Sequence, residues 1–226
     1  MKKYGAKVLA LAAAAWMAPA GFAGVIVQAT GISSPQGTQS ASGYELIQIV
    51  NQSGLSAAYT SGVTDFDTYL ASTTHNSGDE YTTTNTGFTN TLGGFPQIIT
   101  FDLGGVYSIS GLGFWATANI GTVTQFRLFA DNDGDPNNGV GTQLGGTFNA
   151  LANGGAAGPG QVFSFGTTLT QFIHLYVDDS SWIDNEVYPG IGEVVFNAGA
   201  SSEVPEPSTT MLVLIGVAGI AIGRRR

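Results

Sequence analysis

The sequence predicts an all-β protein, built as an antiparallel sandwich or barrel, and two observations lead to this prediction. Seven short runs of β-branched and aromatic residues follow one another, separated by turns of Gly, Asn or Asp. No stretch of residues 24–200 has the spacing of apolar residues that is typical of a helix. Short strands at this spacing are typical of sandwiches and barrels. The seven runs cover residues 97–103, 107–117, 123–130, 145–151, 161–165, 172–177 and 192–197.

The alternation of side chains predicts which face of a strand is buried. In the run FIHLYV (172–177), Ile173, Leu175 and Val177 lie on one face, and His174 and its aromatic neighbours lie on the other. We expect the aliphatic face to point into the core, because a strand with one buried face keeps its apolar side chains on that face.

The part of the chain before residue 97 gives a weaker signal. Residues 25–27 and 44–50 are predicted to form two short strands, with a polar loop over 33–42 between them. Residues 51–94 are rich in Thr, Ser, Gly and Asn. A polar stretch of this length is either mobile or a binding loop.

The N-terminal end has the three parts of a secretory signal peptide over residues 1–23. A lysine-containing start is followed by an apolar run over 8–17 and by small residues over 18–23. We expect cleavage after Ala23, with Ala20 as the second choice. Residues 24–200 then form one domain, which is long enough to bury a core.

The C-terminal end has three parts in a fixed order. A Pro/Ser linker over 201–208 contains the tetrad Val-Pro-Glu-Pro, and an apolar run and three arginines follow it. We predict a transmembrane helix with an arginine tail over 209–226. The 15 residues 209–223 make about 22 Å of helix, whereas the hydrocarbon core of a bilayer is about 30 Å thick. The helix can therefore span the bilayer only if its flanking residues contribute. The arginines are expected to stay cytoplasmic. The tetrad and the arginines are Val204, Pro205, Glu206, Pro207, Arg224, Arg225 and Arg226.

This end of the chain resembles the PEP-CTERM sorting signal of Gram-negative bacteria. The resemblance implies that the Sec machinery exports the chain, that its tail holds it transiently in the inner membrane, and that an exosortase recognises and cleaves the tail. The product would be a cell-surface or exopolysaccharide-associated protein. The alternative is an ordinary tail anchor with a chance Pro-Glu-Pro.

The charge balance between the two ends is strongly acidic. Residues 24–202 contain Arg127 as their only Lys or Arg and 14 of the 16 acids, all but Glu203 and Glu206, so their net charge is −13. A surface with this balance repels phosphate backbones, which excludes nucleic-acid binding. It attracts cations instead, and calcium is the abundant hard cation outside cells. We expect Arg127 to pair with a neighbouring acid. The chain has no cysteine, so no disulfide contributes to its stability.

The strand region carries a second resemblance. The segments QIITFDLGGVYSISGLGFW, TQFRLFAD, QVFSFGTTLTQFIHLYVDD and GIGEVVF are similar to discoidin or coagulation-factor type C domains. The resemblance covers residues 97–196 and implies a galactose-binding-like jelly-roll β-sandwich, which many bacterial carbohydrate-binding modules share. It is loose over 54–90.

The resemblance also implies a structural calcium between an acidic N-terminal loop and a glutamate of the last strand. The matching positions are Asp65, Asp67 and Glu193. In an extended turn, Asp65 and Asp67 would point the same way. Two alternatives remain open: the two aspartates are solvated loop acids, and Glu193 accepts hydrogen bonds from backbone amides.

A second candidate calcium loop follows the strand 123–130. Asp131, Asp133 and Asp135 alternate with other residues, as oxygen ligands do in calcium loops. The loop departs from the EF-hand pattern, since Pro136 replaces the required Gly and Thr142 stands where a bidentate Glu should be. The alternative is a solvated turn.

A sugar-binding site on a sandwich needs aromatic and polar groups that converge at a loop end. Trp182 and Tyr188 lie in a predicted loop, with three polar residues between them, and His75 in the long polar stretch could complete the site. Alternatively, Trp182 plugs the open end of the sandwich. Trp115 is expected in the core, because it follows apolar residues of a strand.

The sequence gives little support for catalysis. It has no cysteine, only two histidines, and no GxSxG, HExxH or phosphate-binding glycine loop. We therefore expect a non-catalytic exported protein that binds extracellular carbohydrate through its sandwich. The alternative is a structural matrix or self-assembling coat protein that binds no sugar.

Overall fold

The computed structural model describes residues 24–34, 45–76, 81–82, 98–117, 122–138, 141–152, 157–180 and 190–199. The predicted signal peptide, linker and transmembrane helix lie outside these ranges. No helix within them is long and apolar enough to cross a membrane.

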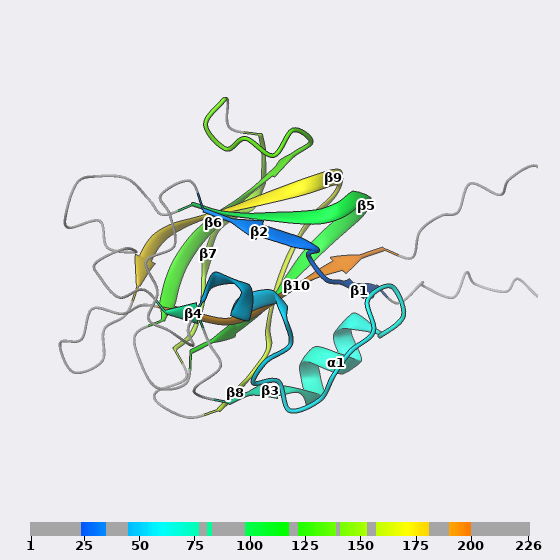
Figure 1. Ribbon diagram of the computed structural model, residues 1–226, viewed down its shortest axis with the longest axis vertical. Helices are drawn as coiled ribbons and strands as arrows, with labels where there is room; N and C mark the ends of the chain where they lie inside the picture. The colour runs from blue at the N-terminus through cyan, green and yellow to red at the C-terminus, as the bar shows by residue number, and fades with distance from the viewer. Residues whose placement is uncertain are drawn as a thin grey trace, which may run out of the picture.

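The described residues form one large antiparallel sheet with the strand order β1-β10-β5-β9-β6-β7 (Figure 1). Two further strands extend it, because β2 pairs with β5 and β4 pairs with β10, while β3 and β8 form a small sheet of their own. The strands are β1 (Val25–Val27), β2 (Gly31–Ser33), β3 (Thr74–His75), β4 (Tyr81–Thr82), β5 (Ile98–Ala116), β6 (Val123–Asp131), β7 (Thr142–Asn149), β8 (Gly158–Pro159), β9 (Gln161–Ser180) and β10 (Gly190–Ala198). The helices are the 3₁₀ helix η1 (Leu46–Val50) and α1 (Phe66–Ser72).

The strands β5 and β9 are long and pass through both layers of a sandwich. Their pairing register shifts between Asp102 and Tyr107, next to Gly104, which has φ of +77°. That φ favours glycine, and a Cβ there would lie 2.7 Å from the hydroxyl of Thr30. We infer that β5 bends at this point, so that its two halves belong to opposite layers.

The two layers meet in one apolar core. Phe101, before the bend of β5, lies 5.3 Å from Phe196 of β10, measured between ring centroids. Phe114, after the bend, stacks on Phe126 of β6 at 5.6 Å. These rings belong to one buried cluster with the aliphatic side chains of β5, β6, β9 and β10. The predicted antiparallel sandwich is therefore confirmed.

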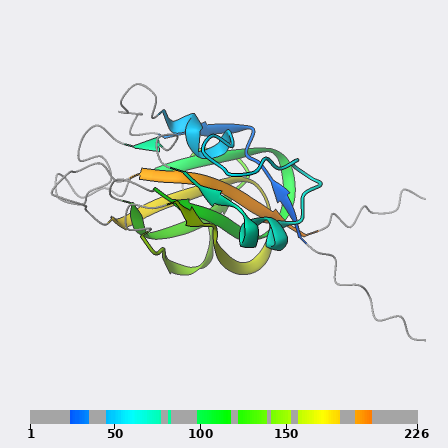
Figure 2. The ribbon, with the colours of Figure 1, turned by 90° about the horizontal axis from the view of Figure 1, so that it is seen from below.

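Both described ends of the domain lie together. Val25 of β1 pairs with Ala198 of β10, so the start of β1 and the end of β10 lie at the same end of the molecule (Figures 1 and 2). At the opposite end lie the last residues of β5 and β9 and the first residues of β6 and β10. We call the first the exit end and the second the loop end.

The predicted strands agree with the structure in most of the chain. The run 25–27 is a strand, and each of the seven runs from residue 97 onward lies on one of β5, β6, β7, β9 and β10. The runs 97–103 and 107–117 form one strand, as do 161–165 and 172–177, because the backbone pairing continues around the bend. The prediction that Ile173, Leu175 and Val177 face the core is confirmed.

Two helices correct the expectation of a domain without helix. The predicted strand over 44–50 is the 3₁₀ helix η1, which buries Leu46 and Ile49 three residues apart, the spacing of a 3₁₀ turn and not of a strand. The predicted extended turn around Asp65 is the start of α1. The Asp65 carboxylate accepts a hydrogen bond from the Thr68 amide at 2.8 Å and so caps the helix.

A second apolar cluster lies under α1. Phe66, Tyr69 and Leu70 pack there against Trp115 of β5, whose side chain is fully buried. The indole Nε1 of Trp115 donates a hydrogen bond to the Thr73 carbonyl at 3.1 Å. The expectation that Trp115 belongs to the core is confirmed.

Candidate functional site

Four strand ends converge at the loop end. Ala116 at the end of β5 pairs with Ile191 of β10, and Val123 at the start of β6 pairs with Ser180 at the end of β9. Thr122 forms a bridge to Gly190, and its hydroxyl donates to the Gly190 carbonyl at 3.3 Å. The β9–β10 connection therefore leaves and re-enters the fold at this end.

Trp182 and Tyr188, the predicted ligand-binding aromatics, lie on this connection. Their positions are outside the described residues. The structure thus places the two ends of their segment at the loop end and leaves their role a prediction.

An ion pair lies on the outer face of β6 and β9, close to the loop end. Arg127 donates from Nε and Nη2 to the two carboxylate oxygens of Asp178, at 2.8 and 2.7 Å. The expectation that Arg127 pairs with an acid is confirmed. The pair is part of the surface, since 34% of the Arg127 side chain and 19% of the Asp178 side chain are exposed.

Two aromatic rings support this ion pair. The guanidinium carbon of Arg127 lies 5.7 Å from the ring centroid of Phe129 and 5.8 Å from that of Tyr176. Burial raises the pKa of the Tyr176 hydroxyl, which donates a hydrogen bond to the Pro136 carbonyl at 3.1 Å. The rings and the carboxylate together fix the orientation of the guanidinium, so its exposed edge is a preorganised hydrogen-bond donor.

Sequence reasoning did not find this arrangement as a candidate site. It found that Arg127 was the only base of the domain, but the aromatic residues under it come from two strands. The register that pairs Arg127 with Tyr176 is a property of the sheet.

The structure corrects the expectation for His75. Its side chain is fully buried, and β3 pairs it with Gly158 of β8. Its ring lies against the backbone of Gly192, where an added Cβ would be 3.0 Å from Nδ1. A side chain with no exposed surface cannot contact a ligand at the loop end, so His75 is a core residue.

Asp65, Asp67 and Glu193, the residues of the predicted calcium site, have different surroundings in the structure. Asp65 caps α1, Asp67 lies exposed in the first turn of the same helix, and Glu193 is completely buried in β10. Within the described ranges, no three His, Cys, Asp or Glu side chains are grouped so that they could hold a metal ion. Asp65, Asp67 and Glu193 thus form no three-carboxylate group in the part of the chain that the structure describes, and a calcium ion held with backbone carbonyls stays a prediction.

Glu193 instead faces hydrogen-bond donors of the protein. Its Oε1 accepts from the Gln52 amide at 3.2 Å and from the Tyr59 hydroxyl at 3.4 Å. Burial raises the pKa of Glu193 to about 9, although these two donors act in the opposite direction. Burial also raises the pKa of Tyr59, and the Glu193 charge adds to that effect.

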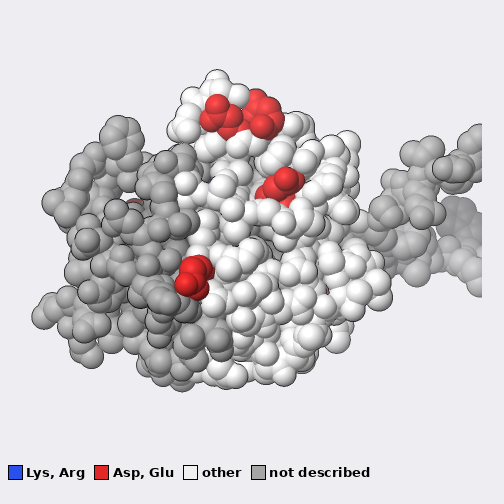
Figure 3. All heavy atoms as spheres, viewed as in Figure 1, with Lys and Arg blue, Asp and Glu red and all other residues white. Residues whose placement is uncertain are grey.

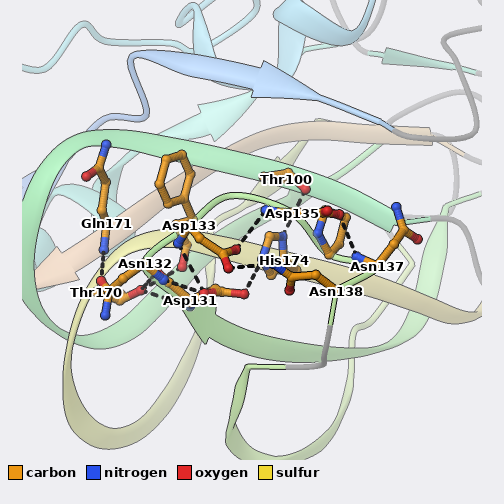
Figure 4. Close-up of polar contacts among 12 residues, drawn as sticks. Thr100, Asp131, Asn132, Asp133, Asp135, Asn137, Asn138, Thr170, Gln171 and His174 are labelled. Atoms are coloured by element: carbon orange, nitrogen blue, oxygen red, sulfur yellow. Dashed lines mark hydrogen bonds and ion pairs between the residues drawn. The ribbon is translucent and has the colours of Figure 1, made fainter.

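The predicted calcium loop at 131–138 is a chain of turns. The side-chain oxygens of Asp131, Asp133 and Asp135 accept hydrogen bonds from backbone amides two residues on, at 3.2, 3.0 and 2.9 Å (Figure 4). Asn138 closes the loop by donating from Nδ2 to Asp133 Oδ2 at 2.5 Å. These bonds lower the pKa of Asp133. The carboxylates therefore organise the turn, and calcium binding by this loop stays a prediction.

His174 lies buried beneath this loop. Its Nδ1 is 2.9 Å from the Thr100 hydroxyl, and its Nε2 is 3.6 Å from Asp131 Oδ2 (Figure 4). Burial lowers the pKa of His174, while the three aspartates of the loop raise it by a smaller amount. The loop thus covers the outward face of β9.

The charges visible on the face shown in Figure 3 are all acidic among the described residues. Red groups lie side by side at the top of the view, and the others lie apart below them with uncharged surface between. This surface agrees with the acidic balance of the sequence and offers no basic patch for a phosphate backbone.

A comparison with protein-family models identifies the C-terminal end. Residues 203–226 match the PEP-CTERM protein-sorting motif. The match contains the tetrad from Val204 to Pro207 and the arginines from Arg224 to Arg226, so the recognition of this signal from the sequence is confirmed. The chain carries a PEP-CTERM sorting motif. No curated protein matches the chain.

Solved structures of carbohydrate-binding modules are similar to the domain. The family 32 module of NanJ from Clostridium perfringens, in complex with galactose, is 12% identical over 77% of this chain and 98% of that chain, with a TM-score of 0.45. The CBM32 of AlyQ, in complex with 4,5-unsaturated mannuronic acid, is 14% identical over 76% and 96%, with a TM-score of 0.40. The C-terminal domain of a chitobiase from Bacteroides fragilis is 15% identical over 76% and 97%, with a TM-score of 0.46. Because these TM-scores are below 0.5, the assignment of the fold rests on the strand order and registers of this chain.

Proposed function

We propose that this chain is a non-catalytic exported protein that binds an extracellular polysaccharide. The sorting motif over residues 203–226 is the observation that carries this proposal, because it is the address of a protein that is exported and then handed to an exosortase. In this view the Sec machinery exports the chain in a Gram-negative bacterium. The tail helix holds it transiently in the inner membrane, and cleavage sends the domain to the cell surface or its matrix.

The loop end is the proposed place of sugar binding. The β9–β10 connection carries Trp182 and Tyr188 and starts three residues after Asp178, the partner of Arg127. Aromatic rings that stack on sugar rings, together with a fixed guanidinium and a carboxylate that bond hydroxyl groups, are the groups that a neutral or weakly charged polysaccharide needs. The net charge of −13 between the two ends disfavours a strongly anionic polymer.

The buried histidines support a non-catalytic role. His75 and His174 are the two histidines of the chain, and both side chains are buried. Neither is open to a substrate as a general base would have to be. The described acids bond to amides, to a hydroxyl or to Arg127, or lie dispersed on the surface.

Retention on polysaccharide tests the sugar-binding part. The purified full chain is applied to immobilised polysaccharide from the producing host, together with Trp182→Ala and Tyr188→Ala variants. We expect retention of the parent chain and a loss of retention of at least about tenfold in each variant, since stacking aromatics dominate such interfaces. Tyr107→Ala is the matched control, because Tyr107 is an exposed aromatic away from the loop end.

The alternative function is a structural matrix or coat protein that binds no sugar. It predicts no retention of the parent chain on any host polysaccharide, together with ordered self-association of the chain. Mass spectrometry of the C-terminus from the host tests the sorting part separately. A mature chain that ends before residue 209 supports exosortase cleavage, and an intact Arg226 in the surface fraction contradicts it.

Calcium remains a prediction from the resemblance to discoidin domains. The three residues predicted to share the ion do not come together, and the proposal therefore contains no step that depends on calcium.

A further inference from the structure

An apolar groove lies at the exit end of the domain. Its volume is about 330 Å³, and it runs between the paired ends of β1 and β10 on one side and the bends of β5 and β9 on the other. None of the residues that line it is charged. These residues are Val25, Val27, Gly62, Val106, Tyr107, Ser108, Leu169, Ala198 and Gly199.

Large apolar side chains stand out from the rim of this groove. Val106 is 60% exposed, Leu169 is 67% exposed, and Tyr107 is 39% exposed. Val63, next to Gly62 of the groove, is 72% exposed. Exposed apolar groups that gather at one place mark a contact surface, whereas single ones do not. We call these four residues the exit rim.

The exit rim surrounds the point where the chain continues toward its tail. Gly199 lines the groove, and its amide donates to the Ser108 carbonyl at 3.0 Å, so the last described residue is fixed beside the rim. Only residues 200–210 separate Gly199 from Met211, where the apolar run of the sorting motif begins. Eleven residues reach at most about 40 Å when fully extended. A chain anchored by its tail therefore holds the exit rim close to the bilayer.

We propose that the exit rim rests on the lipid surface while the tail is anchored, so that the domain stands with its loop end away from the membrane. This inference rests on the membrane anchoring in the proposed function and adds an orientation to it. Valine and leucine enter the interfacial layer of a bilayer, and tyrosine is enriched there. Because no charged residue lines the groove, contact with lipid would bury no charge.

Lipid fits the exit rim better than two other occupants. The residues that follow Gly199 are Ala, Ser, Ser and Glu, which are too polar to fill an apolar groove. A second copy of the domain would bring together two bodies with a strong net negative charge. The bilayer is the apolar phase that the anchored chain necessarily meets.

Fluorescent labels at single cysteines test the orientation. The chain has no cysteine of its own, so Val106→Cys and Leu169→Cys each give one labelling site. The labelled full chains are reconstituted into vesicles of zwitterionic phosphatidylcholine, because a negative lipid surface would repel the acidic domain. Leu151→Cys is the matched control, because Leu151 is also apolar and is 74% exposed. It lies away from the exit rim, since the amide of the preceding Ala150 donates to the carbonyl of Thr124 near the start of β6.

We expect a blue-shifted emission and quenching by lipid-bound quenchers for the labels at 106 and 169, and neither effect for the label at 151. If the chains float with the vesicles but the three labels show the same emission and the same lipid quenching, the orientation is overturned and the anchoring is left intact. Protection from a soluble quencher without lipid quenching would show that the tail fills the groove, and protection that depends on protein concentration would show a second copy. Either result overturns the inference.

Vesicle flotation separates the failure of the anchoring from that of the orientation. A full chain that does not float with the vesicles contradicts the anchoring part of the proposed function, and this inference with it. A Val106→Ser, Leu169→Ser variant, labelled at Val63→Cys, is expected to float like the parent chain while the label loses its lipid quenching. Unchanged quenching in this variant contradicts a contact made by the rim.

Discussion

Arg127 and Asp178 form a two-pronged ion pair on the outer face of the sheet, with nitrogen–oxygen distances of 2.8 and 2.7 Å. The pair joins neighbouring strands β6 and β9, and the aromatic rings of Phe129 and Tyr176 lie beside the guanidinium. It thus ties the base-poor domain together near the proposed sugar-binding end.

The first prediction concerns this ion pair. Arg127→Met keeps the apolar stem over the rings but removes the two charged hydrogen bonds, and we expect it to lower the free energy of unfolding by about 1 to 2 kcal/mol. Urea unfolding measures this change. Arg127→Lys keeps the charge without the two-pronged geometry. Its free energy of unfolding should lie between those of the parent chain and of Arg127→Met. A Met variant as stable as the parent would show that the pair contributes nothing.

The second prediction concerns the buried carboxyl of Glu193. Its pKa is about 9 in the folded protein and 4.5 as the ordinary value, so between these pH values the folded state keeps a proton that the unfolded chain loses. Stability should therefore fall as the pH rises from about 4.5 to 9. Glu193→Gln should remove this fall and be more stable than the parent chain at pH 8. Urea unfolding at pH 5 and pH 8 tests both statements.

The control for Glu193 is Tyr59→Phe, which removes the hydroxyl that donates to the carboxyl but keeps the carboxyl itself. Its stability should still fall with pH. A parent chain whose stability is flat across this window would mean that Glu193 is ionised when folded.

The third prediction separates a protonated Glu193 from a calcium ligand. A calcium ion at Glu193, as the resemblance to discoidin domains implies, would hold the carboxylate ionised and would raise the melting temperature. Because Asp65 and Asp67 do not join Glu193, we expect a chelator to leave the melting temperature unchanged. A drop of several degrees with chelator, restored by calcium and absent in Glu193→Gln, would show an ion at this residue.

The fourth prediction concerns the buried His174. Its pKa is lowered from 6.5 by burial, so the unfolded chain takes up a proton at a higher pH than the folded protein does. Stability should be complete above about pH 6.5 and fall as the pH decreases below it. His174→Gln should remove the fall. The measurement is best made in a Glu193→Gln background, because Glu193 changes stability in the opposite direction over the same pH range.

Asp131→Asn provides the control for His174. Asp131 is the nearest acid to the imidazole and raises its pKa, so removing the charge should carry the loss of stability to lower pH. A loss that levels off at the same pH in both chains would mean that the loop aspartates do not act on His174.

The fifth prediction concerns Gly24, the first residue of the predicted mature chain. A Cβ at Gly24 would lie 1.8 Å from Oδ1 at the end of the Asn197 side chain, which has to turn away, so Gly24→Ala should lower the free energy of unfolding by about 0.5 to 1 kcal/mol. Gly146→Ala is the matched control, since nothing lies within 4 Å of its added methyl group. An Asn197→Ala background should remove most of the cost, and an equal cost in that background would contradict the clash.

Part of the fold could be predicted because its signals are local. Alternation along the run 172–177 placed Ile173 and Leu175 in the core correctly, and the runs of β-branched and aromatic residues marked β5, β6, β9 and β10. The helix α1 could not be predicted from apolar spacing because it has only seven residues, and it depends on the cap that Asp65 supplies. The signal for that cap is an Asp three residues before Thr68, and in the sequence the same Asp65 also fits a metal-binding pattern.

The candidate site was predicted less well than the fold. His75 stood among polar residues in the sequence, yet β8, 83 residues later in the chain, pairs with its strand, and the ring is buried. Arg127 was predicted to pair with an acid, but the sequence did not single out Asp178 or the rings of Phe129 and Tyr176. Such contacts depend on strand register, which joins residues far apart in the chain.

The sequence by itself determined the long strands from β5 onward, the aliphatic core face of β9, the acidic balance and the sorting motif over 203–226, because each depends on neighbouring residues or on composition. The tertiary structure alone decided that Glu193 is buried beside Gln52 and Tyr59, that Asp65 caps a helix, and that the apolar side chains of the exit rim surround the end of β10. The reason is that burial and proximity arise from pairing across the whole sheet, and the bends in β5 and β9 bring together segments that local patterns cannot relate.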